Sequence, residues 1–254
     1  MKFVDFLGDE RLRHKIVYSK RSYSQCIYCG KKADTREHIP SKVFLNRPYP
    51  KNLAIVPACS KCNNSFSPDE LFLSILIEKI KSRYHKQQYA ISEEIAARIK
   101  NNEKLANEIE EILENNTLNE LDERITRIVF KLAIGHAVYE ISEGYCINKG
   151  TISYSFLSNM SNDEAEDFTI PLILNEELLP EIGSRAYDRI VLIDLEMSPI
   201  NDKAENIITP IMMLDWVEVQ EYKYIYTAFR GRDQIIVKMI LNNFFYAKVV
   251  IYVD

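Results

Sequence analysis

Four cysteines in two close pairs frame the residues of this chain that could do chemistry. The pairs are Cys26-x-x-Cys29 and Cys59-x-x-Cys62, and Gly30 directly follows the first pair. Two short loops that each present two thiolates suit a tetrahedral Zn²⁺ ion. A glycine just after the second ligand gives such a loop the backbone freedom that it needs. We therefore expect one structural zinc ion bound by these four cysteines.

An acid–histidine pair and two asparagines accompany the cysteines. Glu37, His38 and Asn52 lie within the 29 residues between the pairs, and Asn63 follows the last cysteine. The neutral imidazole of His38 can accept a proton near physiological pH. Glu37 and Asn63 offer hard oxygen ligands, which suit Mg²⁺ or Mn²⁺ better than Zn²⁺. Phosphodiester cleavage needs both a deprotonated water and relief of charge on the phosphorane, so this set of residues suits that reaction.

The stretches "CIYCG", "TREHIPSKVF", "NLAIVPA" and "CSKCNN" resemble the HNH endonucleases of the ββα-metal class in their zinc-stapled form. The resemblance covers about residues 23–70. His38 precedes Asn52 by 14 residues, and Asn52 precedes Asn63 by 11. Asn63 stands where the namesake pattern has its second histidine, so the sequence favours an H-N-N version of the site.

The resemblance implies a role for each of these residues. His38 would be the general base, and Asn52 would fix the loop that carries it. Glu37 and Asn63 would ligate a catalytic Mg²⁺ or Mn²⁺. Two cations near the motif, Lys42 and Lys61, are expected to contact nucleic-acid phosphates.

Several of these residues also have a structural interpretation. Glu37-His38 could form a solvated turn, Asn63 could cap a helix, and Asn64 could be the ligand instead of Asn63. The stretch 67–70 reads as a helix start, with serine at the N-cap, proline at the first position and glutamate completing a capping box. His136 lies on the apolar face of an expected helix, and Cys146 stands alone, so we expect both to be buried.

The charge of the chain is unevenly distributed. The net charge is −5, which by itself disfavours nucleic-acid binding. The segment 11–61, however, carries twelve lysines and arginines against two acids, which makes it +10 and the remainder −15. Positive charge therefore collects around the motif, as attraction of phosphates requires. A solvated basic surface without a ligand is the alternative.

Length and composition set the remaining bounds. A chain of 254 residues with 46% hydrophobic residues can form one or two domains with proper cores. Four of the five cysteines belong to the two pairs, which favours a reducing, cytoplasmic location over a disulfide framework. The N-terminus lacks the apolar run of a signal peptide, and no stretch is apolar enough to span a membrane.

The pattern predicts an α+β fold with three regions. Residues 1–87 would form a zinc-stapled ββα-metal module, residues 88–145 a helical region, and residues 146–254 an antiparallel β-rich region of unknown role. Expected helices cover 68–87, 92–115 and 119–141. Expected strands cover 151–157, 188–195, 215–229, 234–241 and 244–253, the last three as a meander.

The sequence thus predicts a metal-dependent HNH endonuclease that hydrolyses nucleic acid, with DNA favoured, and a possible place in restriction or phage defence. The alternative is a zinc-knuckle nucleic-acid-binding or adaptor protein that does not cut. The C-terminal region could bind a protein partner or a second copy of the chain.

Overall fold

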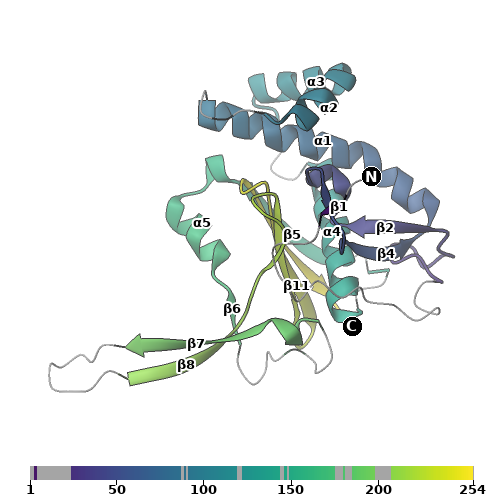
Figure 1. Ribbon diagram of the computed structural model, residues 1–254. Helices are drawn as coiled ribbons and strands as arrows, with labels where there is room; N and C mark the ends of the chain where they lie inside the picture. The colour runs from purple at the N-terminus through teal and green to yellow at the C-terminus, as the bar shows by residue number, and fades with distance from the viewer. Residues whose placement is uncertain are drawn as a thin grey trace.

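The computed structural model of the chain, shown in Figure 1, has the α+β fold that the sequence predicts. The structure describes residues 3–4, 24–86, 89, 91–118, 122–143, 146–147, 149–174, 180, 185–197 and 207–253. Within these ranges, no helix is both long enough and apolar enough to cross a membrane.

A β-hairpin followed by a long helix forms the N-terminal part. β2 (Thr35–Ile39) pairs antiparallel with β4 (Ala54–Ala58), and α1 (Ser60–His85) follows directly. Successive side chains of a strand point to opposite faces. Glu37 is accordingly buried together with Ile39, whereas Arg36 is exposed and His38 is partly exposed. Glu37 and His38 therefore face opposite sides of the hairpin. A short parallel pair, β1 (Phe3–Val4) with β3 (Tyr49–Pro50), lies beside it.

The expected start of α1 at Pro68, with Ser67 as its N-cap, is wrong, because the helix begins eight residues earlier, at Ser60. Cys59 takes the N-cap position, and its sulfur accepts a hydrogen bond from the backbone N–H of Cys62 at 3.4 Å. Pro68 lies inside the helix. A proline there removes one backbone hydrogen bond but keeps a helical φ. The cysteine pair therefore sets the helix start.

Two short helices replace the single one expected over 92–115. α2 (Glu93–Asn101) begins after Ser92, whose side chain caps it, and α3 (Glu103–Glu114) follows after a break at Asn102. The backbone of Asn102 has φ −133° and ψ 48°, outside the helical region. Both helices lie above α1 in the view of Figure 1.

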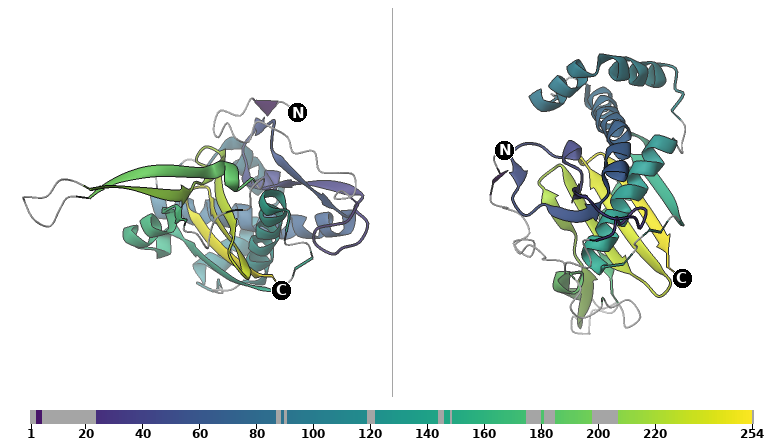
Figure 2. Two further views of the ribbon diagram at one scale, coloured as in Figure 1. Left: turned by 90° about the horizontal axis from the view of Figure 1, so that it is seen from below. Right: turned by 90° about the vertical axis from the view of Figure 1, so that its right-hand side faces the viewer.

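The central element is α4 (Glu123–Ile141), which packs between the N-terminal hairpin and the main sheet (Figures 1 and 2). His136 is fully buried, as predicted, with its ring stacked on Tyr226 at 3.7 Å between centroids and its Nε2 2.8 Å from the Tyr224 hydroxyl. At Gly135 the helix approaches β2 so closely that an added Cβ would lie 2.5 Å from Cδ1 of Ile39.

The main sheet has five antiparallel strands in the order β5-β12-β11-β10-β9. The expected meander is confirmed in its last three strands, although the segment expected as one strand over 215–229 contains a turn that separates β9 from β10. The strands are β5 (Gly150–Phe156), β9 (Val217–Gln220), β10 (Tyr224–Arg230), β11 (Gln234–Leu241) and β12 (Phe245–Tyr252).

A second sheet projects from the body of the molecule, as Figure 2 shows most clearly. β7 (Ile190–Met197) pairs with β8 (Ile207–Leu214), which also pairs with β6 (Leu172–Ile173). Leu192 and Ile193 are 70% and 41% exposed on β7. β8 was not predicted. α5 (Asn162–Thr169) precedes this sheet and starts with a capping box at Ser161.

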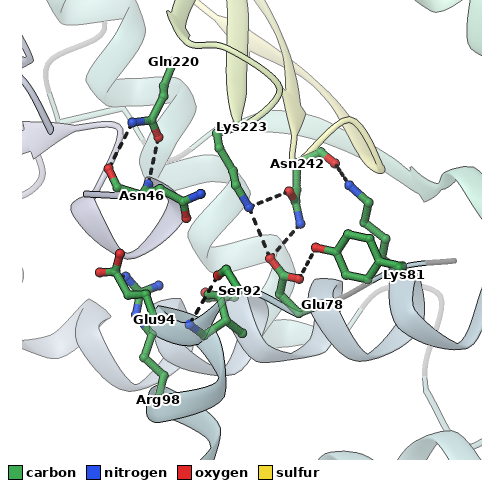
Figure 3. A network of polar contacts seen from close by, with 12 residues as sticks. Asn46, Glu78, Lys81, Ser92, Glu94, Arg98, Gln220, Lys223 and Asn242 are labelled. Atoms are coloured by element: carbon green, nitrogen blue, oxygen red, sulfur yellow. Dashed lines mark hydrogen bonds and ion pairs between the residues drawn. The ribbon is translucent and has the colours of Figure 1, made fainter. Parts of the chain in front are cut away.

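One hydrophobic cluster draws side chains from all three expected regions, from Ile27 through Ile128 to Ile251. Polar contacts add to this continuity at the far end of α1 (Figure 3). The buried Glu78 accepts hydrogen bonds from Asn242 at 2.8 Å and from Lys223 at 3.5 Å, both from the main sheet and its turns. The division of the chain into three regions stays a prediction, but the core that they build is shared.

Candidate metal centre and catalytic site

The four paired cysteines converge at the base of the hairpin. The Sγ atoms of Cys26, Cys29, Cys59 and Cys62 all lie within 4.8 Å of one another. The Cys29 and Cys59 sulfurs are 3.7 Å apart, close to the edge of about 3.8 Å that a Zn–S distance of about 2.3 Å gives a tetrahedron. The four cysteines are therefore arranged so that they could hold a metal ion such as zinc.

Local backbone contacts place these sulfurs. The first knuckle closes through a hydrogen bond from the Gly30 N–H to the Cys26 carbonyl at 2.9 Å, and Gly30 has a φ of +70°. A glycine adopts that conformation without strain. The second knuckle is fixed by Asp34, whose carboxylate accepts bonds from the backbone N–H and the hydroxyl of Ser60 at 2.6 and 2.7 Å. These contacts hold the pKa of Asp34 below its ordinary value.

Cys146 is not the buried residue that the sequence predicts. Its side chain is exposed, and it lies against the first knuckle. The Cys146 N–H donates to the carbonyl of Ile27 at 2.7 Å, and an added Cβ on Gly30 would meet the Cys146 sulfur at 3.2 Å. A loop after α4, far away in the sequence, is thereby attached to the knuckle.

His38 lies on the outer face of the hairpin, opposite Ile55 and on the same face as the exposed Arg36. Burial, and then the charge of Lys42, lower the pKa of His38 to about 4. Its imidazole is therefore neutral at physiological pH, in the state that accepts a proton.

The two asparagines lie at different ends of the hairpin. Asn52 is in the turn that leads into β4, where it lines a small cavity with Ile39 and Tyr226. Asn63 is in the first turn of α1, where its backbone N–H donates a hydrogen bond to the Cys59 carbonyl at 3.0 Å. Asn52 thus lies near the Ile39 end of β2, whereas Asn63 lies near the Thr35 end, beside the cysteines.

Glu37 has a partner that the sequence did not reveal. Its carboxylate forms an ion pair with the ammonium of Lys131 on α4, and the Lys131 side chain is 0% exposed. Lys131 also donates to Ser41 Oγ at 2.6 Å and forms an ion pair with Glu70 of α1. Ser41 in turn donates to the Glu70 carboxylate. We call Lys131, Glu37, Glu70, Ser41 and Tyr28 the Lys131 cluster.

Two polar atoms of the Lys131 cluster are buried without a well-formed hydrogen bond within the described ranges: Oε2 of Glu37 and the hydroxyl of Tyr28, which lies beside Glu37. Burial raises the pKa of Glu37 against the opposing effect of Lys131. Burial, followed by the charge of Glu37, raises the pKa of Tyr28. A lysine in the apolar run of α4 was the signal in the sequence that an ionic partner was needed.

The basic residues that the structure describes are mostly at the surface. Lys61 is exposed in the first turn of α1, and Lys42 is half-buried near His38. The other described members of the basic segment are exposed: Lys31, Lys32, Arg36, Arg47 and Lys51. The part of the segment before residue 24, with five of its cations, lies outside the described residues.

Comparison of the chain with protein-family models, with curated proteins and with solved structures found no match.

Proposed function

We propose that this chain hydrolyses phosphodiester bonds in nucleic acid, with DNA as the favoured substrate, and that His38 is the general base. The observation that carries the proposal is a neutral, half-buried imidazole beside Lys42 and Arg36, on a hairpin whose cysteines adjoin the start of α1. We further propose that the ion at the cysteines is Zn²⁺, with a structural role, and that the protein works in the reducing cytoplasm.

In this mechanism His38 takes a proton from the attacking water. The imidazole is already neutral at physiological pH, so no prior deprotonation is needed, although its lowered pKa also makes it a weaker base than an ordinary histidine. The nearby cations, Lys42 and Arg36, offset the phosphate charges, so they favour binding and reduce the repulsion that the water nucleophile meets.

The divalent ion that the resemblance implies does not fit the contacts of its expected ligand. Glu37 is turned into the core, where its carboxylate pairs with Lys131. A Mg²⁺ or Mn²⁺ ion in direct contact with Glu37 would have to displace that ammonium. We therefore derive no catalytic step from such an ion, and the ligand roles of Glu37 and Asn63 stay predictions.

The second candidate is a zinc-knuckle protein that binds nucleic acid without cutting it. The ion pair between Glu37 and Lys131 favours it, because a ββα-metal nuclease is expected to use that acid as a ligand. A role in restriction or phage defence stays a prediction under either candidate.

A cleavage assay separates the two candidates. The full chain is incubated with supercoiled plasmid, with and without Mg²⁺ or Mn²⁺, beside His38→Ala and a matched control, His85→Ala. His85 is a half-buried histidine at the other end of α1. We expect nicked or linear product from the wild type and the control, and at least a hundredfold slower cleavage by His38→Ala. Equal rates for His38→Ala and wild type would refute the base assignment.

A further inference from the structure

The Lys131 cluster has the composition of a cation site. Two carboxylates and a serine hydroxyl surround one positive charge, and the tyrosine hydroxyl lies beside Glu37. Oxygen atoms of these types are the ligands that Mg²⁺ and Mn²⁺ prefer. The cation in place is the ammonium of Lys131.

Two features of the cluster favour more positive charge than one ammonium supplies. With both carboxylates ionised, Glu37, Glu70 and Lys131 sum to a net charge of −1. In addition, Oε2 of Glu37 is buried in a residue that is only 4% exposed, and the group beside Glu37 is the buried hydroxyl of Tyr28, which is neutral and adds no positive charge. Carboxylate oxygens in such surroundings are normally paired or bound to a metal.

We propose that the ammonium of Lys131 occupies a cation site built by Glu37, Glu70 and Ser41 and excludes Mg²⁺ and Mn²⁺ from it. Lys131 is held by three side chains at once and is withdrawn from solvent, so an incoming divalent ion must expel a buried charge. A neutral side chain at this position opens the same oxygens to a divalent ion. The ammonium of Lys131 therefore supplies the positive charge that a divalent ion from solution would supply at a metal site with the same oxygen ligands.

This proposal deepens the proposed function. Only the role of the excluded ion in cleavage rests on that function. If the chain cuts nucleic acid, the reaction does not draw on a divalent ion at Glu37 while α4 is docked. The exclusion itself is a property of the folded chain without nucleic acid, so it can be measured separately.

The test measures binding of Mn²⁺ to the full, zinc-loaded chain by the electron paramagnetic resonance signal of free Mn²⁺. We expect wild type to bind none that depends on Glu37. Lys131→Met should bind one additional Mn²⁺ per chain, at least tenfold more tightly than any Mn²⁺ that wild type binds elsewhere, and the double variant Lys131→Met/Glu37→Gln should lose that gain. The matched control is Lys223→Met, which removes a cation from one buried carboxylate, Glu78, that keeps its hydrogen bond from Asn242, rather than from a pair of carboxylates (Figure 3).

Two results would overturn the proposal. One is a folded Lys131→Met protein that binds no more Mn²⁺ than wild type. The other is Mn²⁺ binding to wild type that Glu37→Gln abolishes, and this measurement decides the question even if Lys131→Met does not fold. If wild type does not cut nucleic acid, only the proposed function is refuted, because both Mn²⁺-binding results can still be measured.

Discussion

Replacing Gly135 by alanine tests the closest approach between α4 and the hairpin that carries His38. The new methyl carbon would lie 2.5, 2.7 and 3.2 Å from Cδ1, Cγ1 and Cγ2 of Ile39. Ordinary contacts between carbon atoms are about 3.5–4.0 Å, so the two backbones must separate or Ile39 must leave its rotamer. Ile39 is 1% exposed, and the cavity that it lines with Asn52 and Tyr226 is small, so a shift of its side chain relieves only part of the clash.

The magnitude follows from two opposing effects. Overpacking of this kind costs roughly 2 kcal/mol, whereas alanine in place of glycine inside a helix gains about 1 kcal/mol. Gly135→Ala should therefore lower the free energy of unfolding by about 1 kcal/mol. In an Ile39→Ala background the methyl group instead fills a cavity, so the same change should raise that free energy by roughly 2 kcal/mol, from helix propensity and about 0.8 kcal/mol of methyl burial.

Urea unfolding of the zinc-loaded protein, followed by far-ultraviolet circular dichroism, measures all four members of this cycle. The decisive outcome is the change of sign between the two backgrounds. If Gly135→Ala stabilises the wild-type protein as much as it stabilises Ile39→Ala, the close approach of α4 to β2 does not exist.

Three further predictions concern the site. Burial and a neighbouring lysine lower the pKa of His38 to about 4, so the cleavage rate should not change between about pH 6 and 8. A tenfold rise of the rate with a midpoint near about pH 6.5 would contradict a neutral imidazole over this range. Cys62→Ser should lose the bound zinc and unfold, whereas Cys146→Ser should keep one zinc per chain by elemental analysis; zinc-free, folded wild type would contradict this. Lys61→Glu should weaken DNA binding, and the slope of the logarithm of the binding constant against the logarithm of salt concentration should become shallower by about 0.9 for each phosphate that is no longer neutralised. The control Lys104→Glu on α3 should leave this slope unchanged. Identical slopes for the two variants would show that Lys61 does not contact DNA.

Local patterns in the sequence predicted the parts of the structure that depend on nearby residues. The spacing within Cys26–Cys29 and Cys59–Cys62 sufficed to predict the sulfur cluster, because each pair lies on a single turn of chain. Alternation and turn residues indicated the meander of the last three strands. The buried His136 followed from its place on an apolar helical face.

Interactions between distant residues account for what the sequence did not reveal. Lys131 lies 61 residues from Glu70 and further still from Glu37, so no local pattern could pair them. Cys146 reaches the knuckle of Cys26 through a hydrogen bond that spans more than a hundred residues. The start of α1 was misjudged because a proline usually marks a first turn, whereas here a cysteine cap upstream begins the helix.

The position of α4 has a consequence for how the protein forms during translation. Roughly 80 residues separate the end of β4 from the end of α4, which a ribosome adds in about 4 to 16 s at about 5–20 residues per second. During that interval Glu37 and Glu70 lack their lysine, and the inner face of the hairpin has no covering helix. Zinc can bind the four cysteines before then, since all four precede α1's second turn. The metal would thus hold the nascent hairpin together until α4 leaves the ribosome and completes its core.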